Sequence, residues 1–326
     1  MKVLVVIPAY NEEDSIRDVV AELKRVAPWA DTHGLPEVPP ACRHHLPRVD
    51  RVDPLVIDDH SGDSTLELCR EAGIPVVALP LNLGIGGGVQ TGYRYAMENG
   101  YDIAVQMDGD GQHDPAMLAR LLQPVIEGRA DMAIGSRFLG DATGTTRASG
   151  KKQDRKSDKK RDRNHDMIRD AAAVMTAIGD VDAPVGMDGG EPEDGAFRST
   201  ALRRVGIRFF ERWILLLSGA RITDATSGFR ACNRTAMRLF IEDYARDYPE
   251  PEAAMTAIRN GLRVVEVPVR MRGRKGGTSS IRRFKSAYYM VKVSLAIAIS
   301  AVKPRMRDLG PETTDSMPNG AERADA

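Results

Sequence analysis

Short apolar runs alternate with stretches of helical periodicity along the N-terminal part of the chain. The first run, KVLVVIP at residues 2–8, is followed by a segment that has Asn11 at its start and apolar residues at helical spacing. Those apolar residues are Ile16, Val19, Val20, Leu23 and Val26. Because asparagine is a favoured N-cap, the pattern predicts a strand and then a helix capped by Asn11.

The same alternation continues toward the middle of the chain. Strands are predicted at 54–59, 75–80, 102–108 and 131–137, and helices at 63–73, 89–100, 115–128 and 198–220. Parallel strands need a crossover connection, which a helix usually supplies in right-handed βαβ units. The pattern therefore predicts an α/β fold with a mainly parallel sheet flanked by helices.

Two segments interrupt this rhythm. Residues 28–54 are rich in proline, and residues 141–196 combine a dense charge run with an acidic, glycine-rich stretch. Neither can bury much apolar surface, so we interpret both as insertions and expect the second to be mobile. The remaining pattern predicts one domain over 1–302, with amphipathic helices at its C-terminal end, and a disordered polar tail at 303–326.

Composition narrows the function classes. The 46 basic and 46 acidic residues cancel, which gives no general attraction to nucleic acid. The three scattered cysteines favour a reducing, cytoplasmic location. The apolar segment 287–302 contains Lys292 and is shorter than the roughly 20 residues that span a bilayer. Because basic residues flank it, this segment suits peripheral contact with the inner face of a membrane.

The stretch VQMDGDGQHDP at residues 105–115 places Asp108, Asp110 and Asp114 close together. An EF-hand loop needs glycine at its sixth position and glutamate at its twelfth. Counted from Asp108, those positions hold His113 and Ala119, so this kind of calcium loop is excluded. Taken alone, the loop is either a solvated turn or part of a cation site.

The glycine-rich stretch GIGGG at residues 84–88 lacks the third glycine of a dinucleotide-binding motif. It also lacks the Lys-Ser/Thr pair of a P-loop. We interpret it as a flexible turn before a helix N-terminus. Such a turn can lie close to a phosphate, or it can be a plain connection between a strand and a helix.

Several polar loops follow predicted strands. In a doubly wound sheet, the loops at the carboxyl ends of the strands converge on one crevice. Here they carry PAYNE, DDHSGDS, NLGIGGG and DGDGQH. An acidic pair after a strand can hold a divalent cation against two phosphates, which is the chemistry that nucleotide-sugars require.

These motifs, in this order, resemble those of family 2 glycosyltransferases of the GT-A fold. The segments that carry the resemblance are IPAYNE, VIDDHSGDST, NLGIGGGVQTG, QMDGDGQHDP and GSRF. DATSGFRACNR at 224–234 and RKGGTSSI at 274–281 are similar to the branch that contains dolichyl- and polyprenyl-phosphate sugar synthases. The resemblance covers about 1–27, 54–140 and 197–302 and leaves out both insertions.

The resemblance implies a role for each matching residue. The donor nucleotide-sugar is expected to contact Pro8, Tyr10, Glu12, Asp59, Gly84 and Ser279. The cation, Mg²⁺ or Mn²⁺, is expected to bind Asp108, Asp110 and Gln112. Oxygen ligands suit these metals and argue against zinc. Asp114 is instead expected to cap the helix that opens at Pro115.

Two arginines and one acid match family positions close to the chemistry. Arg137 and Arg274 are expected near the acceptor phosphate or the donor diphosphate, since arginine pairs bidentately with phosphate oxygens. Asp224 either acts as a general base, as in relatives that glycosylate hydroxyls, or only orients the site or holds an arginine. Ser280 stands where this branch often carries lysine.

The predicted activity is a metal-dependent, inverting transfer of a sugar from a UDP- or GDP-sugar to a polyprenyl or dolichyl phosphate. An alternative is the same chemistry on a saccharide hydroxyl, as in glycan synthesis. A nucleotidyltransferase is disfavoured because PAYNE stands where its basic, glycine-rich loop belongs. A non-catalytic relative is disfavoured because Asp108, Asp110 and Gln112 are all present.

Overall fold

The computed structural model of the chain describes residues 1–26, 49–139, 201–246, 249–272 and 283–306. Within these residues seven strands form one sheet, in the order β3-β2-β1-β4-β6-β5-β7. The strands are β1 Lys2–Ala9, β2 Arg51–Asp58, β3 Val76–Ala78, β4 Ile103–Gln106, β5 Met132–Ser136, β6 Arg230–Asn233 and β7 Val264–Pro268. Neighbours pair in parallel except β6, which runs antiparallel to β4 and β5. The predicted mainly parallel sheet is confirmed.

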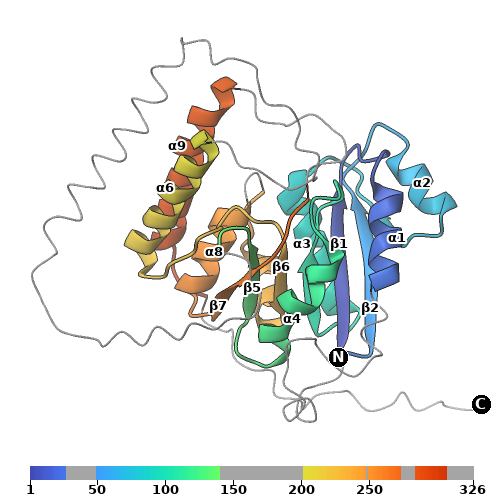
Figure 1. Cartoon of the computed structure of the whole chain (residues 1–326), viewed down its shortest axis with the longest axis horizontal. Helices are drawn as coiled ribbons and strands as arrows, with labels where there is room; N and C mark the ends of the chain where they lie inside the picture. The colour runs from blue at the N-terminus through green and yellow to red at the C-terminus, as the bar shows by residue number, and fades with distance from the viewer. Residues whose placement is uncertain (27–48, 140–200, 247–248, 273–282, 307–326) are drawn as a thin grey trace, which may run out of the picture.

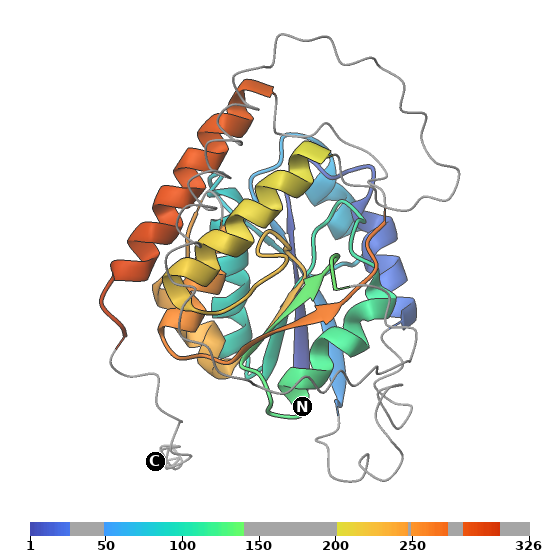
Figure 2. The ribbon, with the colours of Figure 1, turned by 60° about the vertical axis from the view of Figure 1, so that its left-hand side comes forward.

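Helices cover both faces of this sheet (Figure 1). They are α1 Ile16–Val26, α2 Thr65–Glu71, α3 Gly84–Glu98, α4 Leu118–Ile126, α6 Ala201–Ser218, α7 Arg234–Glu242, α8 Pro249–Arg259 and α9 Arg283–Val302, with a 3-10 turn η3 at Pro115–Met117. The side chains of α1, α2 and α4 join the core on one face, and those of α3, α6, α7, α8 and α9 join the core on the other. α6 and α9 lie side by side (Figure 2), and Figure 1 shows them at the opposite side of the molecule from α1 and α2.

The central strand β1 contributes to both cores. Val3, Val5 and Ile7 pack on the α1 face, and Leu4 and Val6 pack on the α3 face. A parallel strand covered on both sides needs apolar residues at successive positions, which explains the unbroken run KVLVVIP.

The start of α1 differs from the prediction. Asn11 has a positive φ of 57° and does not cap the helix, which begins at Ile16. Its Oδ1 instead accepts a hydrogen bond from the backbone N–H of Gly62 at 2.8 Å. Asn11 therefore joins the loop after β1 to the loop after β2, and this non-local contact replaces the predicted cap.

The glycine-rich stretch also differs from the prediction, because α3 begins at Gly84 and contains the glycines. A Cβ on Gly86 would collide with the carbonyl oxygen of Ala245, and the Gly86 N–H donates to the carbonyl of Arg246 at 3.1 Å. The stretch is thus the first turn of a helix packed against the 245–246 backbone. It is not a free turn ahead of the helix.

The predicted insertions fall mostly outside the described residues. β2 begins at Arg51, so the first insertion ends before residue 54. The segment 141–196, most of the 303–326 tail, Arg274 and Ser279 lie outside the described part of the chain. The expectations for them remain predictions.

Candidate active site

The loops that carry the predicted motifs meet at one end of the sheet. β1, β2, β4 and β5 all end there, because they run in the same direction. β6 runs the opposite way, and Arg230 at its start pairs with Gln106 at the end of β4. The segment 224–229, which precedes β6, therefore reaches the same end of the sheet as the acidic loop after β4.

Internal hydrogen bonds organise the acidic loop. The backbone N–H of Asp108 donates to Nδ1 of His113 at 2.9 Å, and the buried Asp110 accepts from the Gln112 N–H at 3.0 Å. Asp114 Oδ1 accepts from the Ala116 N–H at 3.0 Å and caps the turn that begins at Pro115. The predicted capping role of Asp114 is confirmed. Asp114 therefore has a different role from the one predicted for Asp108 and Asp110.

Arg272 attaches a distant segment to this loop. Its Nη1 lies 2.7 Å from Glu22 Oε2, and its Nη2 lies 2.7 Å from Asp114 Oδ1. Its backbone N–H also donates to the carbonyl of Gln112 at 2.9 Å. The acidic loop is therefore held both to α1 and to the chain that follows β7, a connection with no signal in the sequence.

The residues at the loop fit a magnesium or manganese ion. Asp108 Oδ1 is buried and, among the described residues, has no hydrogen-bond partner, although 29% of the side chain is exposed. The described part of the chain contains no cluster of three or more His, Cys, Asp or Glu side chains suited to a metal. Asp108, Asp110 and Gln112 offer two carboxylates and an amide oxygen, the kind of ligand that Mg²⁺ and Mn²⁺ prefer, and substrate phosphates would complete the coordination. That these three residues bind a cation remains a prediction.

Three residues predicted to contact the donor, Pro8, Tyr10 and Glu12, lie at the end of β1 and in the loop after it. Pro8 is near the end of β1, and Tyr10, directly after it, is 53% exposed. The Glu12 N–H donates to Thr65 Oγ1 at 2.8 Å, and its Oε2 accepts from Ser15 Oγ at 3.0 Å. The first bond connects the loop after β1 to the start of α2, and the second lies within that loop.

Asp59 has a structural partner that the sequence did not indicate. Its buried carboxylate accepts from the Leu83 N–H at 2.6 Å, so it holds the start of α3 next to Gly84. Burial raises the pKa of the Asp59 carboxyl, and backbone hydrogen bonds from Leu83 and Gly84 oppose this rise. Contacts of Asp59 and Gly84 with the donor remain predictions.

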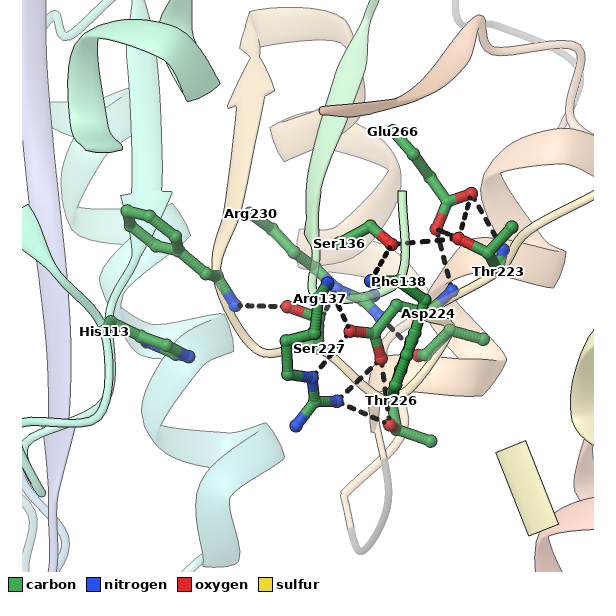
Figure 3. Close-up of polar contacts among 12 residues, drawn as sticks. His113, Ser136, Arg137, Phe138, Thr223, Asp224, Thr226, Ser227, Arg230 and Glu266 are labelled. Atoms are coloured by element: carbon green, nitrogen blue, oxygen red, sulfur yellow. Dashed lines mark hydrogen bonds and ion pairs between the residues drawn. The ribbon is translucent and has the colours of Figure 1, made fainter. Parts of the chain in front are cut away.

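Arg137 and Asp224 form a buried ion pair beside Thr226 (Figure 3). Arg137 Nη2 lies 2.6 Å from Asp224 Oδ1, and Arg137 Nε lies 2.7 Å from Asp224 Oδ2. Oδ2 also accepts from the Arg137 N–H at 3.1 Å, and Oδ1 accepts from Thr226 Oγ1 at 3.2 Å. Both carboxylate oxygens of Asp224 are occupied, which favours its role of holding an arginine over that of a general base.

Glu266 on β7 supports this pair from behind. It accepts hydrogen bonds from the backbone N–H groups of Thr223 and Asp224, each at 2.8 Å. Burial raises the pKa of the Glu266 carboxyl, and the hydrogen bonds from Thr223 and Asp224 oppose the rise. Neither Glu266 nor His113 was singled out from the sequence, because each acts through a contact between distant segments.

The fold and the site together define a class of protein. A mainly parallel sheet that carries an acidic loop at its carboxyl end agrees with the GT-A fold that the sequence resemblance implies. The sequence model of the glycosyl transferase family 2 matches residues 4–178, more than half of the chain. The chain belongs to this family, and the predicted resemblance is confirmed.

Two relatives that match this chain over most of their length are distant in sequence. Polyprenol monophosphomannose synthase of Mycolicibacterium smegmatis is 26% identical over 302 residues, which cover 90% of this chain and 86% of the relative. UDP-N-acetylglucosamine–dolichyl-phosphate N-acetylglucosaminyltransferase of Methanococcus voltae is 25% identical over 288 residues, which cover 82% and 84%.

A solved structure shares the fold. Glucosyl-3-phosphoglycerate synthase of Mycobacterium tuberculosis superposes with a TM-score of 0.50 at 17% identity, over 93% of this chain and 81% of that one. An identity this low supports the fold alone. The predicted GT-A class agrees with this match.

Proposed function

We propose that the protein transfers a sugar from a UDP- or GDP-sugar to a polyprenyl or dolichyl phosphate, with inversion at the anomeric carbon. Membership of family 2 supports the use of a nucleotide-sugar donor and an acceptor. The relatives from M. smegmatis and M. voltae, which by name act on polyprenol and dolichyl phosphate, support the lipid phosphate as the acceptor.

The observation that carries this choice of acceptor is the ion pair of Asp224 with Arg137. A saccharide hydroxyl must lose a proton as it attacks, so its transferase needs a general base near the acceptor. Asp224 is fully buried, and both its oxygens accept hydrogen bonds, so it is poorly placed to take that proton. A phosphate acceptor is already ionised near neutral pH and does not need a base.

Each predicted residue then has a defined role. Asp108, Asp110 and Gln112 would hold the cation, which would supply electrostatic stabilisation of the negative charge on the departing nucleotide diphosphate. Arg137, oriented by Asp224, pairs with the acceptor phosphate or the diphosphate, and Arg274 assists it. The remaining residues bind the donor: Pro8, Tyr10, Glu12, Asp59, Gly84 and Ser279.

A lipid acceptor requires contact with a membrane. Within the described residues, no helix combines the length and the apolar character needed to cross a bilayer. Val291, Leu295, Ile299 and Val302 are between 49% and 81% exposed along α9, and they form what we call the α9 stripe. An exposed apolar stripe on a helix is suited to lie in the headgroup region, which supports a peripheral association.

A transfer assay tests the proposal directly. UDP- and GDP-sugars are each incubated with a short polyprenyl phosphate and Mg²⁺ or Mn²⁺, and the released nucleotide and the glycolipid are measured. We expect one donor to give turnover. EDTA is expected to abolish this turnover, and the Asp110→Ala variant is expected to show none. Turnover with saccharide acceptors only would favour the hydroxyl alternative, and full activity of Asp110→Ala would contradict the metal role.

A further inference from the structure

The segment Asp224–Arg230, with the sequence DATSGFR, lies between two parts of the active site. Its first residue holds Arg137, as described above. Its last residues lie beside the end of β4, because Arg230 pairs with Gln106 across the antiparallel ladder. The acidic loop begins two residues after Gln106, so the same short segment also reaches Asp108.

Gly228 lies against the Asp108 carboxylate. A Cβ added to Gly228 would be 3.0 Å from Asp108 Oδ1, 3.2 Å from Asp108 Oδ2 and 3.1 Å from Gln106 Nε2. Contacts of 3.0–3.4 Å are tighter than nine in ten real Cβ contacts, so a side chain here would require the carboxylate or its neighbours to shift by a few tenths of an ångström. Glycine at residue 228 therefore allows the Asp108 carboxylate to lie directly on the backbone.

Phe229 acts on Asp108 through His113. The two rings stack with centroids 5.0 Å apart and an interplanar angle of 18°, and His113 is only 4% exposed. His113 Nδ1 accepts the backbone N–H of Asp108 at 2.9 Å. His113 Nε2 lies 3.7 Å from Asp108 Oδ2, so the imidazole faces both the backbone and the carboxylate of Asp108.

Arg230 fixes the shape of the segment. Its side chain is fully buried, and it donates from Nε to the carbonyl of Ser227 at 2.7 Å and from Nη2 to the carbonyl of Ala225 at 2.8 Å. The Phe229 N–H adds a bond to Ser227 Oγ at 3.3 Å. A buried guanidinium that binds two carbonyls of its own turn leaves the turn little freedom to move.

We propose that Asp224–Arg230 is a positioning element that sets the Asp108 carboxylate, through Gly228 and the Phe229–His113 stack, in the orientation that binds the divalent cation. The same element sets Arg137 through Asp224, so it fixes the cation ligand and the phosphate-binding arginine relative to each other. Partners behind a metal ligand commonly change metal affinity by about 10–100-fold when they are altered. The inference rests on the metal role in the proposed function.

Binding of Mn²⁺ tests the element without the need for turnover. The full chain is titrated with Mn²⁺ in the presence of UDP or GDP, and free Mn²⁺ is followed by its electron paramagnetic resonance signal. We expect Gly228→Ala and His113→Phe to weaken Mn²⁺ binding by about 10–100-fold. His113→Phe retains a ring to stack on Phe229 but removes the acceptor for the Asp108 N–H. His113→Asn offers Oδ1 as an acceptor in place of Nδ1 but has no ring to stack on Phe229, so it is expected to recover only part of the lost affinity.

Gly100→Ala is the matched control. Gly100 has φ +70° and no atom within 4 Å of an added Cβ, so alanine strains the backbone without touching the site. It is expected to bind Mn²⁺ like the wild type. Near-ultraviolet circular dichroism establishes that each variant is folded.

Three results would overturn the inference. If the folded His113→Phe variant binds Mn²⁺ like the wild type, the imidazole does not position Asp108. If Gly100→Ala loses as much Mn²⁺ affinity as the site variants, the loss reflects general destabilisation of the protein. A wild type that takes up no Mn²⁺ with either nucleotide overturns the metal role in the proposed function, and the positioning inference with it.

Discussion

Arg137 and Asp224 form a two-point ion pair between segments that are 87 residues apart in the sequence. Only 7% of the arginine side chain and none of the aspartate side chain is exposed. Charges removed from water to this degree are stable only when each is well paired and hydrogen-bonded. The pair therefore fixes the end of β5 to the segment before β6, and it holds in place the guanidinium that we assign to phosphate binding.

Breaking this pair from either side is expected to be costly. Asp224→Asn or Arg137→Met leaves one buried charge without its partner, and we expect each to lower the free energy of unfolding by about 3–5 kcal/mol. The double variant is expected to lose less than the sum of the two, because it leaves no charge unpaired. Urea unfolding of the four proteins measures this coupling.

The control for the cycle is an exposed ion pair. Arg221 lies 2.7 Å from Glu211 with 71% of its side chain exposed, and Arg221→Met is expected to cost less than about 1 kcal/mol. Additive losses in the Arg137 and Asp224 variants would show that the buried pair does not act as a unit.

Glu266 makes the stability of this region depend on pH. Burial raises the pKa of its carboxyl above the ordinary value, so the folded protein keeps this proton to a higher pH than the unfolded chain does. The stabilisation is complete below the unfolded pKa and is lost as pH rises through the folded pKa. We expect the unfolding free energy of wild type minus that of Glu266→Gln to fall as pH rises from the ordinary glutamate pKa of about 4.3 through the raised pKa of the folded state. Urea unfolding at a series of pH values measures this difference, and a difference that rises with pH would contradict the assignment.

The sequence correctly predicted those elements whose structure depends mainly on residues nearby in the chain. The run KVLVVIP became β1, and Asp114 before Pro115 became a cap, since both depend on neighbours in the sequence. Asn11 satisfied the same local rules, but its side chain bonds to Gly62 instead. Gly62 lies in another loop, so the residues next to Asn11 in the sequence do not reveal this contact.

The direction of β6 was the main feature that the sequence did not specify. A short strand such as Arg230–Asn233 carries the same pattern in either direction. Its antiparallel course brings Asp224 and Gly228 to the end of the sheet that holds the acidic loop. The resemblance of DATSGFR to the family was therefore visible in the sequence. Its contacts with Arg137 and Asp108 could be seen only once the fold was known.

The glycines at the start of α3 are expected to respond oppositely to alanine. Gly86→Ala places a Cβ against the carbonyl of Ala245, and we expect it to destabilise the protein by about 1–3 kcal/mol. An added Cβ on Gly88 meets only Pro8 Cβ at 3.5 Å and Ile57 Cγ2 at 3.8 Å, which are ordinary contacts. Gly88→Ala is expected to stabilise the helix by up to about 1 kcal/mol, because alanine restricts the unfolded chain. Thermal unfolding of both variants compares them, and equal effects would contradict the packing of Gly86 on residue 245.

The α9 stripe is expected to carry the association with membranes. Leu295, at its centre, is 59% exposed, and Trp213 Nε1 of α6 donates to the carbonyl of Ser294 at 3.0 Å, which fixes the helix behind it. Burial of one leucine in an apolar phase contributes about 1.5–3 kcal/mol, so Leu295→Ser is expected to weaken vesicle binding about tenfold or more. Sedimentation with vesicles that contain anionic lipid measures the partition.

Leu66→Ser, on α2 and joined to the opposite face of the sheet, makes the same chemical change and is expected to bind like the wild type. Equal binding by all three proteins would exclude the α9 stripe as the membrane contact.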